Sequence, residues 1–359
     1  MSFHRRYELA CFLWNLAALH SELGSRIDRS TEVGIKAANK HFQLAAGALE
    51  AIGTVCMPHL PSLLGTSTSA GGPISVLAIR MGVQLMLGQA QLCFYEKAVK
   101  DRKAGTMKPS IIAKLAVQTG LFYGAAGDLC KQGVLASYLD PSWAGHCSFQ
   151  HRCFLAAAEY WQSQAAKEEA QQKGSGYAEE IARLLRAEAH LKEALLIAEK
   201  ARLGVSLTNG AAALQRTVGA ARTSAEHDNR TVYMEKVPAD GALVAVSAVS
   251  MVKPGECGLL CVAVWYCCCV LCAVCCVLCA AVCCCLSDVC CRSCVLWFDA
   301  RSTVCCLLPA ACCLLSAVCC LLAAVCWLLP AVDAVDTVPL AVAYRWLFPS
   351  SLCATLLAN

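Results

Sequence analysis

The chain has 359 residues, of which 58% are hydrophobic and 16% charged, and its formal net charge is +4. A charge so close to neutral argues against a nucleic-acid-binding protein, and the length allows two domains. The composition changes after Glu256, because 23 of the 29 cysteines and no Lys or His follow that residue. The sequence predicts a domain at 1–256 and a low-complexity Cys/Leu/Ala/Val tail at 257–359.

The sequence of residues 1–256 predicts long amphipathic helices. Apolar residues recur every three or four positions at 7–26 and, after an N-cap at Ser30 and Thr31 with acidic Glu32, up to Ile52, which indicates a helical hairpin. A stretch rich in Pro, Gly, Ser and Thr at 58–73 predicts a long surface loop before a third helix at 74–103.

Two further helices begin at prolines, a residue that loses no hydrogen bond at the first helical position. Pro109 starts one, and Pro141 starts the other with Asp140 as its N-cap. Each is expected to run for about 25 to 30 residues before the next turn signal.

A last helical pair is predicted at 177–203 and 208–225, with Ser175 capping the first member and breaks at Gly204 and at Asn209–Gly210. Strand signals are nearly absent. The sequence therefore predicts an all-α protein built as a solenoid resembling tetratricopeptide repeats, although no clean repeat of about 34 residues is found.

Seven segments occur in a fixed order, and MVKP at 251–254 closes the series: NLAALHSELG (15–24), KHFQLAAGALE (40–50), LGQAQLCFYEKA (87–98), MKPSIIAKLAVQ (107–118), AAEYWQSQAAK (157–167), YAEEIARL (177–184) and DNRTVYMEKVP (228–238). Together they resemble the Bro domain family, that of Alix, the yeast Bro-one protein and the rhophilins. The resemblance implies a helical solenoid with a tetratricopeptide-like core.

The resemblance also implies a function. Bro domains bind the C-terminal amphipathic helix of ESCRT-III subunits and act in endosomal and multivesicular body sorting and membrane scission. The family's apolar groove has an aromatic anchor on one helix and an Ile and a Leu on the next, and these roles fall on Phe94, Ile111 and Leu115. Docking of an apolar helix stripe on such side chains is a common recognition mode.

Cationic residues surround these three positions: Lys97, Lys100, Arg102, Lys103, Lys108 and Lys114. Such a cluster suits an acidic amphipathic helix, and Lys97 and Lys114 are the cations expected to bind it. The alternative is that the three apolar residues lie in the core and the lysines form an ordinary solvated face.

Tyr233 matches a family tyrosine that serves some relatives as a regulatory phosphorylation site. Met234, Glu235 and Lys236 replace the Asn, Asp and Arg that usually follow it. Packing of the Tyr233 ring against the solenoid is an equally open interpretation.

The sequence also departs from the family in two larger ways. The match begins part-way into the family's domain, so an N-terminally truncated module with an uncovered helix face and reduced stability is expected. Residues Arg102 to Thr106 lengthen the turn beside the predicted groove and are expected to change its rim.

Catalytic and cofactor-binding motifs are not found, so neither an enzyme nor a cofactor is expected. His146, Cys147, His151 and Cys153 form the one compact metal-like cluster before the tail, but no second ligand pair has matching spacing. Ordinary helix residues are the favoured interpretation.

The expected location is cytoplasmic and endosome-associated, with ESCRT-III as the partner and peripheral membrane contact. A Bro-type or general helical scaffold in pH or small-GTPase signalling is the alternative. The uncharged run at 258–286 is long enough to span a membrane, which would make the protein membrane-anchored. A seven-residue repeat starting with CCLLPAA at 305–311 favours another origin, in which much of 257–359 is intron or untranslated DNA repeat captured by a gene model.

Overall fold

The computed structural model describes residues 3–59, 74–133 and 135–256, and the chain there is helical without a β-strand. The long helices are α1 (Phe3–Arg26), α2 (Glu32–Ala51), α4 (Val76–Lys103), α5 (Pro109–Cys130), α7 (Pro141–Lys173), α8 (Ala178–Lys200) and α9 (Val205–Asp228). Short helical turns are η1 (Ile52–Cys56), η2 (Met57–His59), α6 (Leu135–Tyr138), η3 (Asn229–Tyr233) and η4 (Asp240–Ala242). The predicted all-α class is confirmed.

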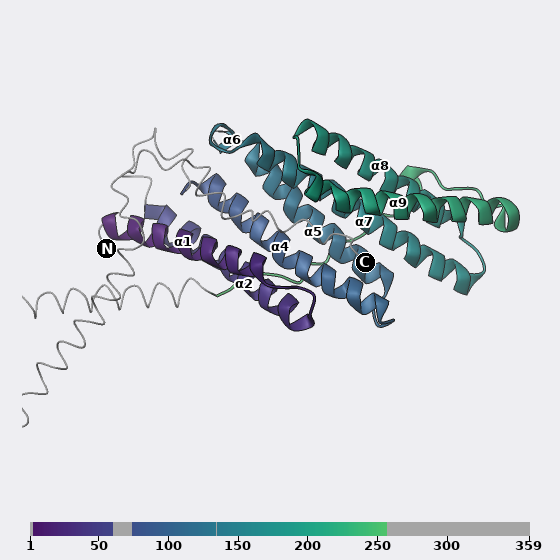
Figure 1. The fold of residues 1–359 in the computed structure, drawn as a ribbon, viewed down its shortest axis with the longest axis horizontal. Helices are drawn as coiled ribbons and strands as arrows, with labels where there is room; N and C mark the ends of the chain where they lie inside the picture. Colours follow the sequence, from purple (N-terminus) through teal and green to yellow (C-terminus); the bar gives the residue numbers. More distant parts are fainter. Residues whose placement is uncertain (1–2, 60–73, 134, 257–359) are drawn as a thin grey trace, which may run out of the picture. The chain divides into compact units, whose positions relative to one another are not determined.

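Each long helix packs mainly on the long helices next to it in the chain. The principal pairs are α1 with α2, α2 with α4, α4 with α5, α5 with α7, α7 with α8 and α8 with α9. Figure 1 shows α1 and α2 (purple) on one side and α8 and α9 (green) on the other, with α4, α5 and α7 between them. Packing between successive elements is the arrangement of a helical solenoid.

The helix starts follow the sequence signals. Thr31 Oγ1 accepts a hydrogen bond from the Gly34 amide at 3.1 Å, and Asp140 Oδ1 accepts one from the Ser142 amide at 2.8 Å. These bonds satisfy amides that have no partner within the first helical turn. The predicted caps of α2 and α7 are therefore confirmed.

Two local predictions are wrong. No break occurs at Asn209–Gly210, since α9 begins at Val205 and continues through both residues. Continuing the helix there buries Ala211 and Leu214, and this packing outweighs the low helix propensity of Asn and Gly. The N-cap of α8 is Tyr177 instead of Ser175, because Gly174 and Gly176 both take positive φ and move the helix start onward.

The core of the middle helices is aromatic. Phe154 of α7 lies between Tyr95 of α4, in an edge-to-face contact with ring centroids 5.6 Å apart, and Tyr123 of α5, in a stacked contact at 5.9 Å. Trp161 Nε1 donates a hydrogen bond to the Tyr95 hydroxyl at 3.1 Å. These contacts join α4, α5 and α7 and fix the helices that carry the predicted groove.

Among the described helices, α4 passes the length and hydropathy test for a membrane span, but 72% of its most apolar stretch is buried inside the protein. Burial of that kind is typical of a core helix. Residues 60–73 of the predicted loop and the tail at 257–359 lie outside the described residues, so the proposed domain boundary after Glu256 remains a prediction.

Candidate partner-binding site

The three predicted groove anchors differ in exposure. The Ile111 side chain is 44% exposed near the start of α5, Phe94 of α4 is half-buried, and Leu115, one turn after Ile111, is only 5% exposed. The alternative of a core position therefore fits Leu115 better than Ile111. In a groove, Leu115 would form the floor while Phe94 and Ile111 remain accessible.

The packing of α4 on α5 brings the anchors to similar levels. The two helices run antiparallel, and a Cβ on Gly88 of α4 would lie 3.4 Å from Phe122 Cβ of α5. Six residues further along α4, about 9 Å at 1.5 Å per residue, Phe94 is level with Ala116. Leu115 and Phe94 therefore lie at one level, with Ile111 about one turn nearer the α4–α5 turn.

An extended segment, residues 234–256, crosses the helices next to these anchors, and it is called the strap below. The buried amide of Gln91 on α4 donates from Nε2 to Val249 O at 2.9 Å and accepts at Oε1 from the Met251 amide at 3.0 Å. The Val249 amide donates to Lys114 O on α5 at 3.3 Å. The strap therefore passes one turn from Phe94 and one turn from Ile111.

The end of the strap is fixed on α2. The Gly255 amide donates to Gln43 O at 2.7 Å. A Cβ on Gly47 would lie 1.8 Å from Gly255 O, so only glycine at position 47 allows this close approach.

The strap adds apolar side chains that the sequence did not point to. Met251 is 52% exposed, and Val249 is partly exposed beside it. Because the backbone of both residues binds the Gln91 side chain, they lie at the edge of the surface that carries Phe94 and Ile111. The MVKP motif was recognised only as a family signature, and nothing in its composition indicates this position.

The predicted cationic side chains differ in their intramolecular partners. Lys97 pairs with Asp101 at 2.8 Å and lies 3.7 Å from Glu32. The hydrogen bond to Asp101 and the charges of both carboxylates raise the pKa of Lys97. Lys100 Nζ donates to the carbonyls of residues 29 and 30, and Arg102 pairs with Glu168. Lys114 contributes its carbonyl to the strap, and its ammonium group has no ion pair among the described residues.

A buried ion cluster anchors the first half of the strap. Arg183 of α8 is buried, and its Nη1 lies 3.1 Å from Oε2 of Glu159 on α7. Arg183 Nη2 donates to Val244 O at 2.7 Å, while Arg186 pairs with both Glu159 at 3.4 Å and Asp240 at 2.6 Å. Sequence reasoning missed this cluster, because Glu and Arg at helical spacing look like a solvated face. A cavity of about 610 Å³ lies alongside it, lined by α5, α7, α8 and the strap.

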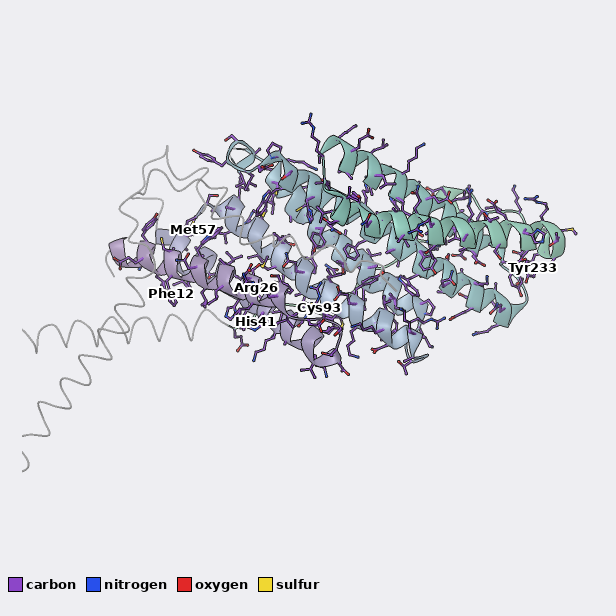
Figure 2. The ribbon with its side chains drawn as sticks, viewed as in Figure 1. Phe12, Arg26, His41, Met57, Cys93 and Tyr233 are labelled. Atoms are coloured by element: carbon purple, nitrogen blue, oxygen red, sulfur yellow. The ribbon has the colours of Figure 1, made fainter. Side chains whose placement is uncertain are left out.

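Tyr233 is the last residue of η3, directly before the strap, and Figure 2 shows it at the end of α9, apart from Cys93 on α4. Its ring stacks on Tyr177 with centroids 3.6 Å apart, yet 39% of the residue remains exposed. The Glu235 carboxylate caps α8 by accepting from the amides of Gly176 at 2.7 Å and Ala178 at 2.9 Å. The structure therefore supplies both the packing contact and an accessible ring.

The metal-like cluster of α7 has other contacts. The His151 Nδ1 atom hydrogen-bonds Gly120 O at 2.7 Å, and the thiols of Cys147 and Cys153 are buried. Burial lowers the pKa of His146 to about 4. Within the described ranges no group of three or more His, Cys, Asp or Glu side chains could hold a metal ion.

The sequence of this chain is similar to those of several known proteins. The protein is 34% identical over 247 residues to the pH-response regulator protein palA/RIM20 of Emericella nidulans and 32% identical over 251 residues to the vacuolar-sorting protein BRO1 of Arabidopsis thaliana. Each alignment covers 69% of this chain but 27% of the relative, so the chain spans about a quarter of the length of these relatives.

A solved structure of the ALIX BRO1 domain in complex with CHMP4C is also similar. The TM-score is 0.58 at 29% sequence identity, and the match covers 70% of this chain and 63% of that one. The family description that matches residues 2–260 is the BRO1-like domain. With its helical solenoid and the returning strap, the chain belongs to the BRO1-like domain family.

Proposed function

We propose that this chain is a recruitment module that binds the C-terminal amphipathic helix of ESCRT-III subunits in endosomal and multivesicular body sorting and membrane scission. The solved complex of the similar ALIX BRO1 domain contains CHMP4C, an ESCRT-III subunit. One relative carries the name vacuolar-sorting protein. Both support a role in sorting.

The observation that carries the proposal is the exposure of Ile111. A large aliphatic side chain that is 44% exposed, beside half-buried Phe94 and above buried Leu115, offers apolar surface that a docked helix would cover. Met251 and Val249 of the strap extend this surface. The recognition mode is a helix in a groove, in which one apolar stripe supplies most of the affinity.

The test is binding of a peptide that corresponds to the C-terminal helix of CHMP4C, measured by isothermal titration calorimetry. Burial of one Ile side chain stabilises a complex enough that Ile111→Asp should weaken binding at least roughly tenfold. Phe94→Asp should act in the same direction. Leu121→Asp is the matched control, because Leu121 is a similarly exposed residue of α5 that lies beyond the strap.

A peptide that binds wild type and Ile111→Asp equally would contradict this site. In that case the second candidate is favoured, a BRO1-type scaffold in pH or small-GTPase signalling. The similarity to the pH-response regulator of Emericella nidulans, at 34% identity, supports this candidate. Pull-down of pH-pathway components that do not need Ile111 would support it further.

The same proposal implies where the protein is located in the cell and how its activity is regulated. Attachment to ESCRT-III places the protein in the cytoplasm at endosomes, with its membrane contact peripheral. The membrane-anchor alternative depends on 258–286, which lies outside the described residues. Phosphorylation at exposed Tyr233 would add negative charge close to that of Asp228 and loosen the start of the strap. Treatment with a tyrosine kinase, with Tyr233→Phe as the control, tests this by hydrogen exchange of the strap.

A further inference from the structure

The lengthened turn between α4 and α5 is held in one conformation. The Thr106 amide and hydroxyl both donate to Asp101 O, at 3.0 and 2.9 Å, and the Gly105 amide donates to Arg102 O at 2.9 Å. Gly105 takes φ of 78°, a left-handed conformation that glycine adopts without strain. The side chains on this turn therefore have a defined position relative to α5.

Two cationic side chains on this turn are exposed and available to bind a partner. Lys103 and Lys108 are both exposed, and neither has an ion pair in the described part of the chain. Their neighbours Lys97 and Arg102 already pair with carboxylates of the protein itself. No acidic residue lies in the first turn of α5 to compensate Lys108.

Lys108 lies on the same face of α5 as the two anchors. Positions 108, 111 and 115 are separated by three and four residues, so they form one stripe along the helix. Lys108 precedes Ile111 by about 4.5 Å along the helix axis. A helix docked on Ile111 and Leu115 that extends toward the turn therefore reaches Lys108 within about one turn of its own.

The sign of the charge also selects the direction of the docked helix. The C-terminus of any helix carries partial negative charge, and acidic side chains in its last turn add to it. Resting on the proposed function, we infer that Lys103 and Lys108 orient the bound helix, whose C-terminus points to the α4–α5 turn and whose last turn is acidic. The partner class is thus narrowed to amphipathic helices with an acidic C-terminal turn.

The experiment uses the full chain and two synthetic amphipathic peptides of identical composition, one with its acidic residues in the last turn and one with them in the first turn. Fluorescence anisotropy measures both affinities at low and high salt. The peptide with the acidic last turn should bind more tightly, and salt should weaken it more. Combined Lys103→Glu and Lys108→Glu should weaken that peptide roughly tenfold and remove its advantage.

The matched control reverses two exposed lysines of another helix, α8, with Lys192→Glu and Lys200→Glu, which change the net charge equally. This control should leave both affinities within about twofold. If the two peptides bind equally, or if the turn variant and the α8 variant behave alike, the orientation is refuted. Loss of binding in Ile111→Asp together with that result would leave the groove proposal standing, whereas intact binding in Ile111→Asp would remove the groove itself.

Discussion

Replacement of Arg183 by Met should strongly destabilise the protein. The Arg183 side chain is only 3% exposed, and it pairs with the 10% exposed side chain of Glu159 at 3.1 Å. The Met side chain is shorter than that of Arg but similar in volume, so the change removes the charge with little change in packing volume. It leaves the Glu159 carboxylate buried, with Arg186 at 3.4 Å as its remaining ion-pair partner in the described part of the chain.

Breaking a buried ion pair typically costs about 3 to 5 kcal/mol, because the remaining charge is desolvated without compensation. Arg186 still faces Glu159, so the expected loss lies near the lower end, about 3 kcal/mol. The variant also loses the hydrogen bond to Val244 O at 2.7 Å. For a domain of this size, the loss corresponds to a decrease in Tm of roughly 6 to 12 °C.

Thermal and urea unfolding followed by circular dichroism measure the loss, and hydrogen exchange measures release of the strap around Val244. Arg26→Met is the control, since the pair of Arg26 with Glu22 is on the surface and should contribute less than about 1 kcal/mol. The double variant with Glu159→Met should lose less than the sum of the two single changes, because no unpaired charge then remains at that contact. A loss below about 1 kcal/mol in Arg183→Met would refute the buried-pair argument.

Two other predictions concern pH and the strap. Burial lowers the pKa of His146 to about 4, so the unfolded chain, with a His pKa near 6.5, binds a proton that the folded protein does not bind between these values. The free energy of unfolding should fall by about 3 kcal/mol as the pH decreases from 6.5 to 4, and His146→Met should flatten this part of the profile in urea titrations. Gly47→Ala should displace the strap end, because the new Cβ would lie 1.8 Å from Gly255 O, and limited proteolysis should then cut the strap faster. Gly219→Ala, where nothing lies within 4 Å, should leave the cleavage rate unchanged.

The sequence predicted the helices well where the signals are local. Thr31 and Asp140 cap helices through amides two or three residues away, and Pro109 and Pro141 restrict the backbone at their own positions. The prediction was wrong where packing between helices decides. Asn209 weakens a helix in isolation, but the contact of α9 with α8 keeps it helical.

The candidate site, like the fold, was predicted only in part from the sequence. The positions Phe94, Ile111 and Leu115 came from the resemblance, and their i and i+4 spacing on α5 followed from sequence, but nothing local distinguishes exposed Ile111 from buried Leu115. The structure also separated the cations into those with intramolecular carboxylate partners, such as Lys97, and exposed ones, such as Lys108. Both distinctions depend on neighbouring helices.

By itself, the sequence determined the all-α class and the order of the helices, because caps, prolines and apolar periodicity act within a few residues along the chain. The resemblance of seven ordered segments indicated the family. Only the tertiary structure decided the course of the strap. Its contacts join Met251 to Gln91 and Gly255 to Gln43, residues far apart in the sequence. Such contacts have no fixed spacing, so they leave no local pattern, and they form only after the packed helices bring their partners together.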